Sequence, residues 1–401
     1  MNLAIMKRRS GALGVVTAVL LCGAVALQAS PARTTTVDPG SDDPFAYAFR
    51  FASAIDADPK DKSMAQASVT LTVALAGQLD RAVALADDVT GWRQGTVYAD
   101  LAAMLAKDGR IEEARGLVAR ADRVRAATEG WQVGRIESHI AQALAVLGDS
   151  ERTREISARL AKGHIQYAGR GVATVAAGHA YDGDFDEAMR ALATLDDETD
   201  YEVTWWRTLG YLDVADRDGL PDTERGRALD AALRSTETIP GWKRGEALQR
   251  VADALIRSGD PDRARTALAT AEQAIAGMPA STPVKGPLYC DLARTWAAVG
   301  DVDRARTLLD EAKKAIEGAM VIERPAIYAE IGSAYLAVGD VARASDFYRS
   351  ALTKAEALVN ARPRALALTA ICSTMGRHGA ALDDPTRTRL DQAFAGLRDP
   401  W

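Results

Sequence analysis

Three tryptophans in this chain keep a fixed distance to a following glycine. In each pair the glycine comes 17 residues later: Trp92 with Gly109, Trp131 with Gly148, and Trp242 with Gly259. A second pattern begins at a glycine. The glycine is followed in order by one residue that is usually aspartate, two further residues, a charged residue and an alanine. The pattern occupies Gly109–Ala114, Gly183–Ala188, Gly259–Ala264, Gly300–Ala305 and Gly339–Ala344. A register kept over so many copies predicts an internally repeated fold.

Each repeat is predicted to be a pair of helices joined by a tight turn. Apolar residues recur at helical spacing both before and after Gly339. Those that follow it are Ala344, Tyr348 and Ala351, which predict the second helix. Glycine ends the first helix because it tolerates positive φ, and the aspartate that follows caps the second. Turns mostly 35 to 41 residues apart are predicted at Gly77, Gly109, Gly148, Gly183, Gly219, Gly259, Gly300, Gly339 and Gly379.

Small residues seven positions before the turn glycine predict close helix approach, as at Gly332. Two repeats depart from the pattern. In the fifth, Asp216–Asp222 predicts a stretched turn and a second helix from about Asp222 to Glu237. In the third, Thr153 and Ser157 replace alanine and a larger apolar residue.

The pattern resembles the tetratricopeptide repeat (TPR). The best match to that family's signature is Tyr328, Ile331, Gly332, Tyr335, Gly339, Ala344, Tyr348 and Ala351. The closing proline is missing, and the spacing exceeds the family's 34 residues, so the chain is TPR-like. The resemblance implies an all-α fold, a right-handed α-α superhelix (solenoid) of about nine helical hairpins. We expect nine units in one register to remain open, with a short capping helix, Phe45–Ile55, at the N-terminal end.

The first 32 residues are predicted to be an export signal. Three basic residues precede an uncharged apolar run, Ala12–Leu27, which is too short to span a membrane comfortably. We therefore expect a signal peptide at 1–32, a polar linker at 33–43, a repeat domain at 44–401, and a periplasmic or secreted location. Removing the signal changes the formal net charge from −6 to −9, which disfavours nucleic acid as a partner. Cys290 and Cys372 fall on helices two repeats apart, so a disulfide between them is not expected.

The sequence contains no pattern that assigns catalysis. Its histidines, at positions 139, 164, 179 and 378, show no metal-ligand spacing. Asp182, Asp184 and Asp186 alternate as calcium ligands do, but they lack the glutamate that a calcium loop needs, so capping explains them better. We expect no enzyme, cofactor or metal site. The alternative is an α/α-toroid hydrolase or lyase acting on envelope glycan or peptide.

The resemblance implies that a protein or peptide partner binds the concave face formed by the first helices. Carried over by register, that face includes Arg135, Gln142, Arg170, Tyr181, Glu246, Gln249, Asp253 and Arg257. Four of these residues, Arg135, Arg170, Gln249 and Arg257, have no local role that the sequence explains. Trp92, Trp131 and Trp242 have two interpretations, which are hydrophobic staples at the start of each hairpin or exposed rings that contact the partner.

Overall fold

The computed structural model describes residues 43–56, 58–163, 167–198, 200–279, 282 and 284–398. All of them belong to one compact unit, Val37–Trp401. The α-helices are α1 (Pro44–Ser53), α2 (Pro59–Leu75), α3 (Leu79–Ala86), α4 (Arg93–Lys107), α5 (Ile111–Ala126), α6 (Trp131–Val146), α7 (Ser150–Gly163), α8 (Ala168–Tyr181), α9 (Phe185–Ala193), α10 (Tyr201–Ala215), α11 (Asp222–Ser235), α12 (Gly241–Arg257), α13 (Pro261–Ala276), α14 (Lys285–Ala298), α15 (Val302–Gly318), α16 (Arg324–Ala337), α17 (Val341–Glu356), α18 (Ala361–Arg377) and α19 (Asp384–Ala395). Two short 3₁₀ helices are η2 (Thr236–Thr238) and η3 (Gly396–Arg398).

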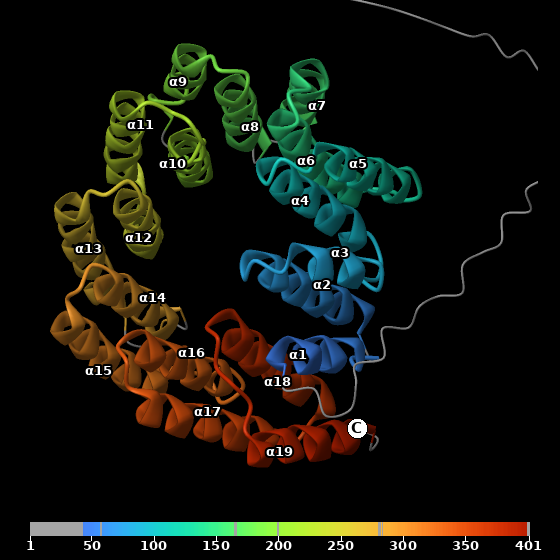
Figure 1. The fold of residues 1–401 in the computed structure, drawn as a ribbon, viewed down its shortest axis with the longest axis vertical. Coiled ribbons are helices and arrows are strands. Elements are labelled where there is room, and N and C mark those ends of the chain that lie inside the picture. The colour runs from blue at the N-terminus through green and yellow to red at the C-terminus, as the bar shows by residue number, and fades with distance from the viewer. Residues whose placement is uncertain are drawn as a thin grey trace, which may run out of the picture. The chain divides into compact units, whose positions relative to one another are not determined.

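After α1, the helices alternate as first and second members of successive hairpins, from α2 and α3 to α18 and α19 (Figure 1). The prediction of an all-α helical-repeat solenoid is confirmed. Every predicted turn glycine has positive φ, between 68° at Gly379 and 92° at Gly183. Side chains other than glycine rarely adopt this conformation, so the sequence marks these turns unambiguously.

The turn aspartates cap the second helices, as predicted. The Oδ1 atom of Asp260 accepts from the backbone N–H of Arg263 at 3.2 Å, and that of Asp301 accepts from Arg304 at 3.0 Å. Asp184 accepts from the backbone N–H of Glu187 at 3.1 Å. These bonds satisfy donors that the first turn of a helix otherwise leaves without a partner.

Close helix approach at glycine is also confirmed. A Cβ atom on Gly332 in α16 would lie 3.2 Å from both the Ala344 carbonyl oxygen and the Tyr348 ring in α17. A Cβ on Gly210 in α10 would lie 3.1 Å from Ala173 Cβ in α8. Gly332 therefore closes a hairpin, whereas Gly210 brings successive first helices together.

The row of hairpins closes on itself within this unit, so the expectation of an open stack was wrong. Helix α1 packs against α18 more extensively than α19 does, and α18 also contacts α2. The ring of Phe45 in α1 packs directly on Gly376 of α18. A Cβ atom on Gly376 would lie 2.7 Å from that ring. Arg50 binds Asp391 of α19 at 2.8 Å, and Arg362 of α18 donates to Asp61 of α2 at 2.7 Å.

The closure has a simple physical basis. Each hairpin buries its apolar face only against its neighbours, so the two ends of a stack need cover. The expected capping helix exists as α1, and it covers the first and the last repeat at once. The spacing of residues within a repeat does not reveal closure, because closure depends on small rotations added over all nine hairpins.

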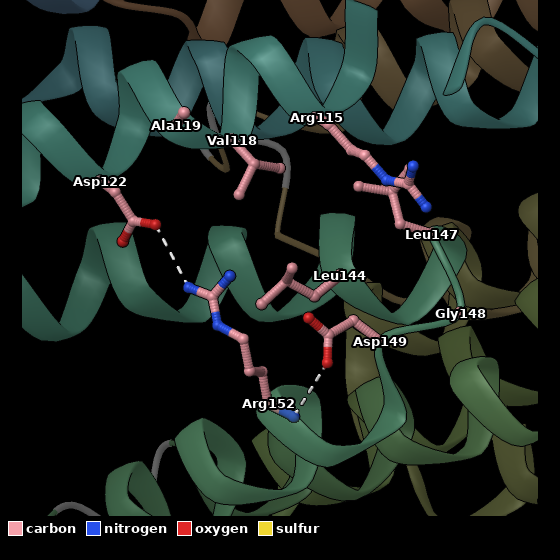
Figure 2. A pocket seen from close by; sticks show the side chains of 9 residues that line it. All are labelled: Arg115, Val118, Ala119, Asp122, Leu144, Leu147, Gly148, Asp149 and Arg152. Carbon is pink, nitrogen blue, oxygen red and sulfur yellow. Dashed lines mark hydrogen bonds and ion pairs between the residues drawn. The ribbon is translucent and has the colours of Figure 1, made fainter. Parts of the chain in front are cut away.

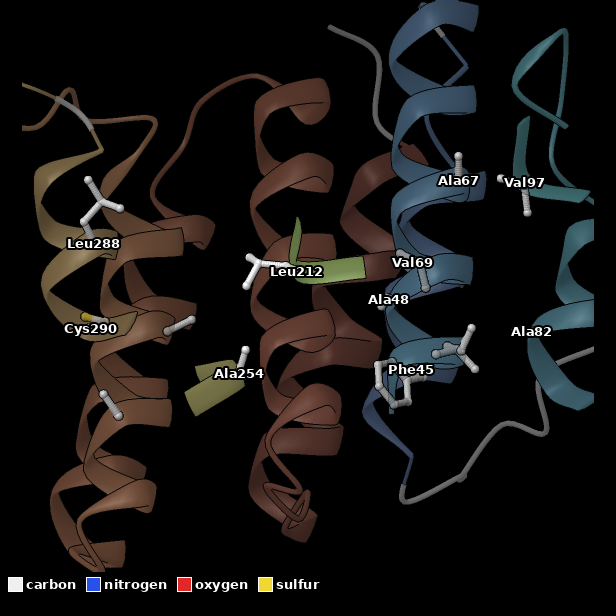
Figure 3. Close-up of a cluster of buried hydrophobic side chains, with 14 of the residues drawn as sticks. Phe45, Ala48, Ala67, Val69, Ala82, Val97, Leu212, Ala254, Leu288 and Cys290 are labelled. Carbon is white, nitrogen blue, oxygen red and sulfur yellow. The ribbon is translucent and has the colours of Figure 1, made fainter. Parts of the chain in front are cut away.

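One continuous apolar core runs through the hairpins. Figure 3 shows part of it, including Phe45 and Ala48 of α1, Val69 of α2, and Leu288 and Cys290 of α14. Cys290 and Cys372 are both buried and free, as expected. No helix in the described part of the chain has the length and apolar character needed to cross a membrane.

The irregular repeats follow their sequence. Helix α11 begins at the predicted Asp222, and η2 follows it up to Thr238. In the third repeat Thr153 and Ser157 are buried in α7, and Gly171 of α8 packs against Ser157. The predicted signal peptide and nearly all of the predicted linker lie outside the described residues.

Candidate ligand-binding site

Two adjoining pockets lie on the first helices α6, α8, α10 and α12. The first has a volume of about 310 Å³ and is lined by Arg135, Tyr167, Arg170, Tyr201, Glu202, Trp205, Trp206 and Lys243. The second has a volume of about 350 Å³ and is lined by Gln142, Trp206, Leu209, Leu212, Asp213, Asp216, Arg250, Asp253 and Arg257. We call them the cationic pocket and the acidic pocket. Trp206 belongs to both, and no second helix lines either one.

Helical spacing explains why these side chains gather. On α10, residues 206, 209, 213 and 216 recur every three or four positions, so they share one face. On α12, residues 243, 250, 253 and 257 follow at intervals of seven, three and four, which also places them on one face. The opposite faces of these helices pack on second helices α11 and α13. The pockets therefore occupy the inner side of the first helices, which Figure 1 shows turned away from the second helices.

Arg170 is the most deeply buried charge in the cationic pocket, with 6% of its surface exposed. Its Nη2 donates to Gln142 Oε1 at 2.7 Å, and its guanidinium carbon lies 4.9 Å from the centre of the Trp206 ring. Its buried Nε has no hydrogen-bond partner among the described residues. Burial lowers the pKa of Arg170 to about 10, with Asp100 opposing the shift and Arg135 adding to it. The structure thus holds a buried cation that has no paired carboxylate among the described residues.

Arg135 on α6 is exposed and makes no ion pair with any described carboxylate. Its charge acts on neighbouring arginines of the same inner surface. Burial lowers the pKa of Arg93 on α4, and repulsion from Arg135 lowers it further. Arg135 therefore repels one arginine on the first helix to either side, Arg93 and Arg170.

Lys243 adds a third cation to the pocket beside two indole rings. Its Nζ lies 4.7 Å from the centre of the Trp205 ring and 4.3 Å from that of Trp242. It is also paired with Glu246 at 3.1 Å, and Glu246 binds Arg250 at 3.1 Å. Glu246, a sequence-predicted site residue, therefore positions the cations around Trp205.

One carboxylate of the acidic pocket, Asp253, is hydrogen-bonded by neutral side chains. Asp253 accepts from Gln249 at 2.5 Å and from Thr295 at 3.0 Å, and burial raises its pKa. Burial also raises the pKa of Asp213, although Lys107 on α4 opposes this shift. A raised pKa indicates that neighbouring cations do not fully compensate the cost of these charges.

Tyr181 and Arg257 are the last residues of helices α8 and α12. Tyr181 of α8 hydrogen-bonds Lys107, and burial raises the pKa of its hydroxyl. Arg257 binds both carboxylate oxygens of Asp216 at 2.9 Å. Tyr181 thus links two repeats that are separated by one, and Arg257 links neighbouring repeats.

The four residues without an apparent local role separate into two groups. Gln249, Arg257 and Arg170 all have partners, so the expectation of no local role was wrong for them. Gln249 also bonds Asp253 four positions along the same helix. The other partners, Thr295, Asp216 and Gln142, lie in other repeats, which sequence spacing does not reveal. Arg135 alone retains no local role in the described structure.

The three tryptophans occupy different environments. Trp92 and Trp131 form an edge-to-face pair with ring centres 5.5 Å apart. Trp92 and Trp242 pack partly buried against the core, in agreement with a staple, whereas Trp131 is 64% exposed. Each follows a glycine with positive φ, at positions 91, 130 and 241, which forms the turn into the first helix.

A larger pocket of about 440 Å³ lies elsewhere, between α5, α6 and α7 (Figure 2). Arg152 pairs there with Asp122 at 3.2 Å, and its backbone N–H donates to Asp149. These charges satisfy one another, so the geometry of this pocket is explained by capping and ion pairing. In the described ranges, no group of three or more histidine, cysteine or acidic side chains could hold a metal ion.

The described histidines do not form a joint site. His139 of α6 bonds Asp100 of α4 with 2.5 Å between Nδ1 and Oδ1. His378 is largely enclosed near α14, and burial together with the charges of Arg294 and Arg377 lowers its pKa to about 3. His164 lies outside the described residues.

Sequence analysis missed the residues of α10, namely Tyr201, Trp205, Trp206 and Asp213, together with Lys243 and Arg250 of α12. The positions of the binding face were not assigned on α10, because the stretched turn that follows this helix makes its alignment with the other repeats uncertain. The signal that could have found them is the run of Trp205, Trp206, Leu209 and Asp213 at helical spacing on one first helix.

No protein-family model matches the chain, and no curated protein matches it. Solved structures with some likeness include the apo form of the quorum sensor NprR from B. thuringiensis, at 12% identity and a TM-score of 0.28, covering 74% of this chain and 88% of that one. A circular tandem repeat protein has 14% identity and a TM-score of 0.28, with coverages of 88% and 94%. Human IFIT1 with PPP-AAAA has 14% identity and a TM-score of 0.27, with coverages of 79% and 73%. At such TM-scores the likeness carries no functional argument, so function has to be argued from the site itself.

Proposed function

We propose that this chain is a non-enzymatic binding protein that holds a peptide segment of a protein partner against the inner faces of α6, α8, α10 and α12. The main support is the pair of adjoining pockets on four successive first helices. They combine aromatic rings, which dominate binding hot spots, with charges that the fold does not pair. The sequence of residues 1–32 supports action in the periplasm or outside the cell, which fractionation of the source cells would test.

The test begins with affinity isolation of the partner on the full chain, followed by calorimetric titration with the purified partner. Arg135→Ala is the cleanest variant, because Arg135 is exposed and forms no ion pair within the part of the chain that the structure describes. We expect it to weaken binding at unchanged melting temperature. Arg115→Ala is the matched control, since Arg115 is an exposed arginine of α5, paired only with Glu112. Equal affinities for both variants and the unmodified chain would contradict the proposal.

A hydrolase or lyase acting on envelope glycan or peptide is a second candidate, supported by two specific observations. The hairpins close on themselves, as in the toroid architecture, and Asp213 and Asp253 line one pocket with raised pKa values. A carboxyl group with a raised pKa can act as a general acid, and Trp206 offers a ring on which a sugar could stack. Turnover of a glycan or peptide, lost in both Asp213→Asn and Asp253→Asn, would favour this candidate over binding alone.

A further inference from the structure

The two pockets differ in charge although they share a wall. The cationic pocket has three cations, Arg135, Arg170 and Lys243, against one carboxylate, Glu202. The acidic pocket has three carboxylates, Asp213, Asp216 and Asp253, against Arg250 and Arg257. The Arg257–Asp216 pair is internally satisfied. Lys243 and Arg250 are both paired with Glu246. Arg135 and Arg170 are therefore left to face a ligand in the cationic pocket, and Asp213 and Asp253 are left in the acidic pocket.

From this arrangement we infer that the site recognises a peptide segment that carries an acidic and a basic side chain. The acidic side chain enters the cationic pocket, and the basic side chain enters the acidic pocket. This inference rests on the proposed function and specifies which class of peptide it serves.

Arg170 gives the cationic pocket its preference for a carboxylate. A buried guanidinium with one neutral acceptor, Gln142, retains donors for an incoming anion, and it is already held in place by Trp206. Because it is fixed before binding, little side-chain entropy is lost when the ligand arrives. Guanidinium groups match the planar geometry of a carboxylate, and Arg135 provides a second one at the mouth.

The helices set the spacing between the two charged side chains. Arg135 and Gln142 mark the two pockets on α6 and are seven residues apart, which is roughly 10 Å at about 1.5 Å per residue. An extended peptide advances by about 3.3 Å per residue. The acidic and basic side chains should therefore lie about three or four residues apart.

The same arrangement disfavours uniformly charged ligands. A nucleic acid or a polyuronate would satisfy Arg135 and Arg170, but its next negative group would face Asp213 and Asp253. Like charges in such surroundings are costly. A peptide of mixed charge avoids that repulsion.

Synthetic peptides test the inference directly. The probe is an acetylated and amidated glycine-serine peptide with aspartate and lysine four residues apart. Its matched controls replace these residues with asparagine and glutamine, or place aspartate at both positions. Binding to the full chain is followed by tryptophan fluorescence. We expect the aspartate–lysine peptide to bind about tenfold or more tightly than either control, as one charge-assisted contact implies.

Variants then assign each charge to its pocket. Arg135→Glu should remove the preference for aspartate and leave that for lysine, and Asp213→Asn should do the reverse. Arg115→Glu on α5 should change neither preference. Equal binding of the neutral peptide, no binding of the aspartate–lysine peptide, or tighter binding of an RNA oligonucleotide or a polyuronate would each overturn the inference. The proposed function would survive those results if the natural partner still bound in an Arg135-dependent way.

Discussion

Two arginines on first helices show how two regions of this chain treat a buried cation. Arg294 of α14 binds Glu330 of α16 at 2.9 Å and also contacts Asp291 and Ser333. Burial alone would lower its pKa, but Glu330 and Asp291 raise it above its usual value. Arg170 of α8 has an amide and an indole ring instead, and its pKa falls to about 10. In the region α14–α18 the buried Arg294 is paired with carboxylates of the same region. In the region α6–α12 the buried Arg170 is left available to a ligand.

The largest expected effect comes from removing each arginine in turn. Arg294→Met leaves Glu330 and Asp291 without their cation and should cost about 3 kcal/mol of unfolding free energy. Arg170→Met removes a cation that has no paired carboxylate in the described ranges and should change stability by no more than about 1 kcal/mol. Chemical denaturation measures both. Equal losses would remove the distinction between the two regions.

Helix packing should be equally tight in both regions, so that the two regions differ only in how they pair their buried charges. Gly210→Leu in α10 and Gly332→Leu in α16 should each cost roughly 1–3 kcal/mol or more, because both glycines are in close contact with neighbouring helices. Gly116→Ala in α5, where a Cβ meets nothing within 4 Å, should stabilise the chain by about 0.5–1 kcal/mol. Thermal melts check all three. An unchanged melting temperature for Gly332→Leu would show that its helices can separate without cost.

The turn aspartates that cap α13 and α15 give a smaller effect, which should not depend on position along the chain. Asp260→Ala and Asp301→Ala each lose a helix cap and should cost about 1 kcal/mol of stability. Affinity for the partner should change little, since neither residue lines the two pockets. Lost binding at unchanged stability would instead move the functional surface to the turns.

A further effect depends on pH and belongs to α14–α18. The folded chain keeps His378 neutral down to a pKa of about 3, whereas the unfolded chain binds a proton near pH 6.5. Its contribution to stability is therefore complete above pH 6.5 and is lost as pH falls toward 3. His378→Gln should lose less melting temperature between pH 7 and pH 5 than the unmodified chain. If both proteins lost the same melting temperature, the pKa of His378 would be the same in the folded and the unfolded chain.

The sequence predicts the repeats much better than it predicts the site. Gly109 and Asp260 encode their turn and cap locally, because positive φ and an unsatisfied helix N-terminus admit few residue types. Arg135 is found by register, as it faces the same side as other first-helix residues. The Arg170–Gln142 contact and the packing of Phe45 against Gly376 join distant helices, so no local pattern specifies them.

Photocrosslinking on α10 tests most directly whether the inner surface is where the partner binds. A photoreactive residue at Leu209, which lines the acidic pocket, should crosslink to the purified partner. The same residue at Ala119 of α5, which lines the outer pocket in Figure 2, should not. Crosslinking at Ala119 and none at Leu209 would contradict the assignment of function to α6–α12.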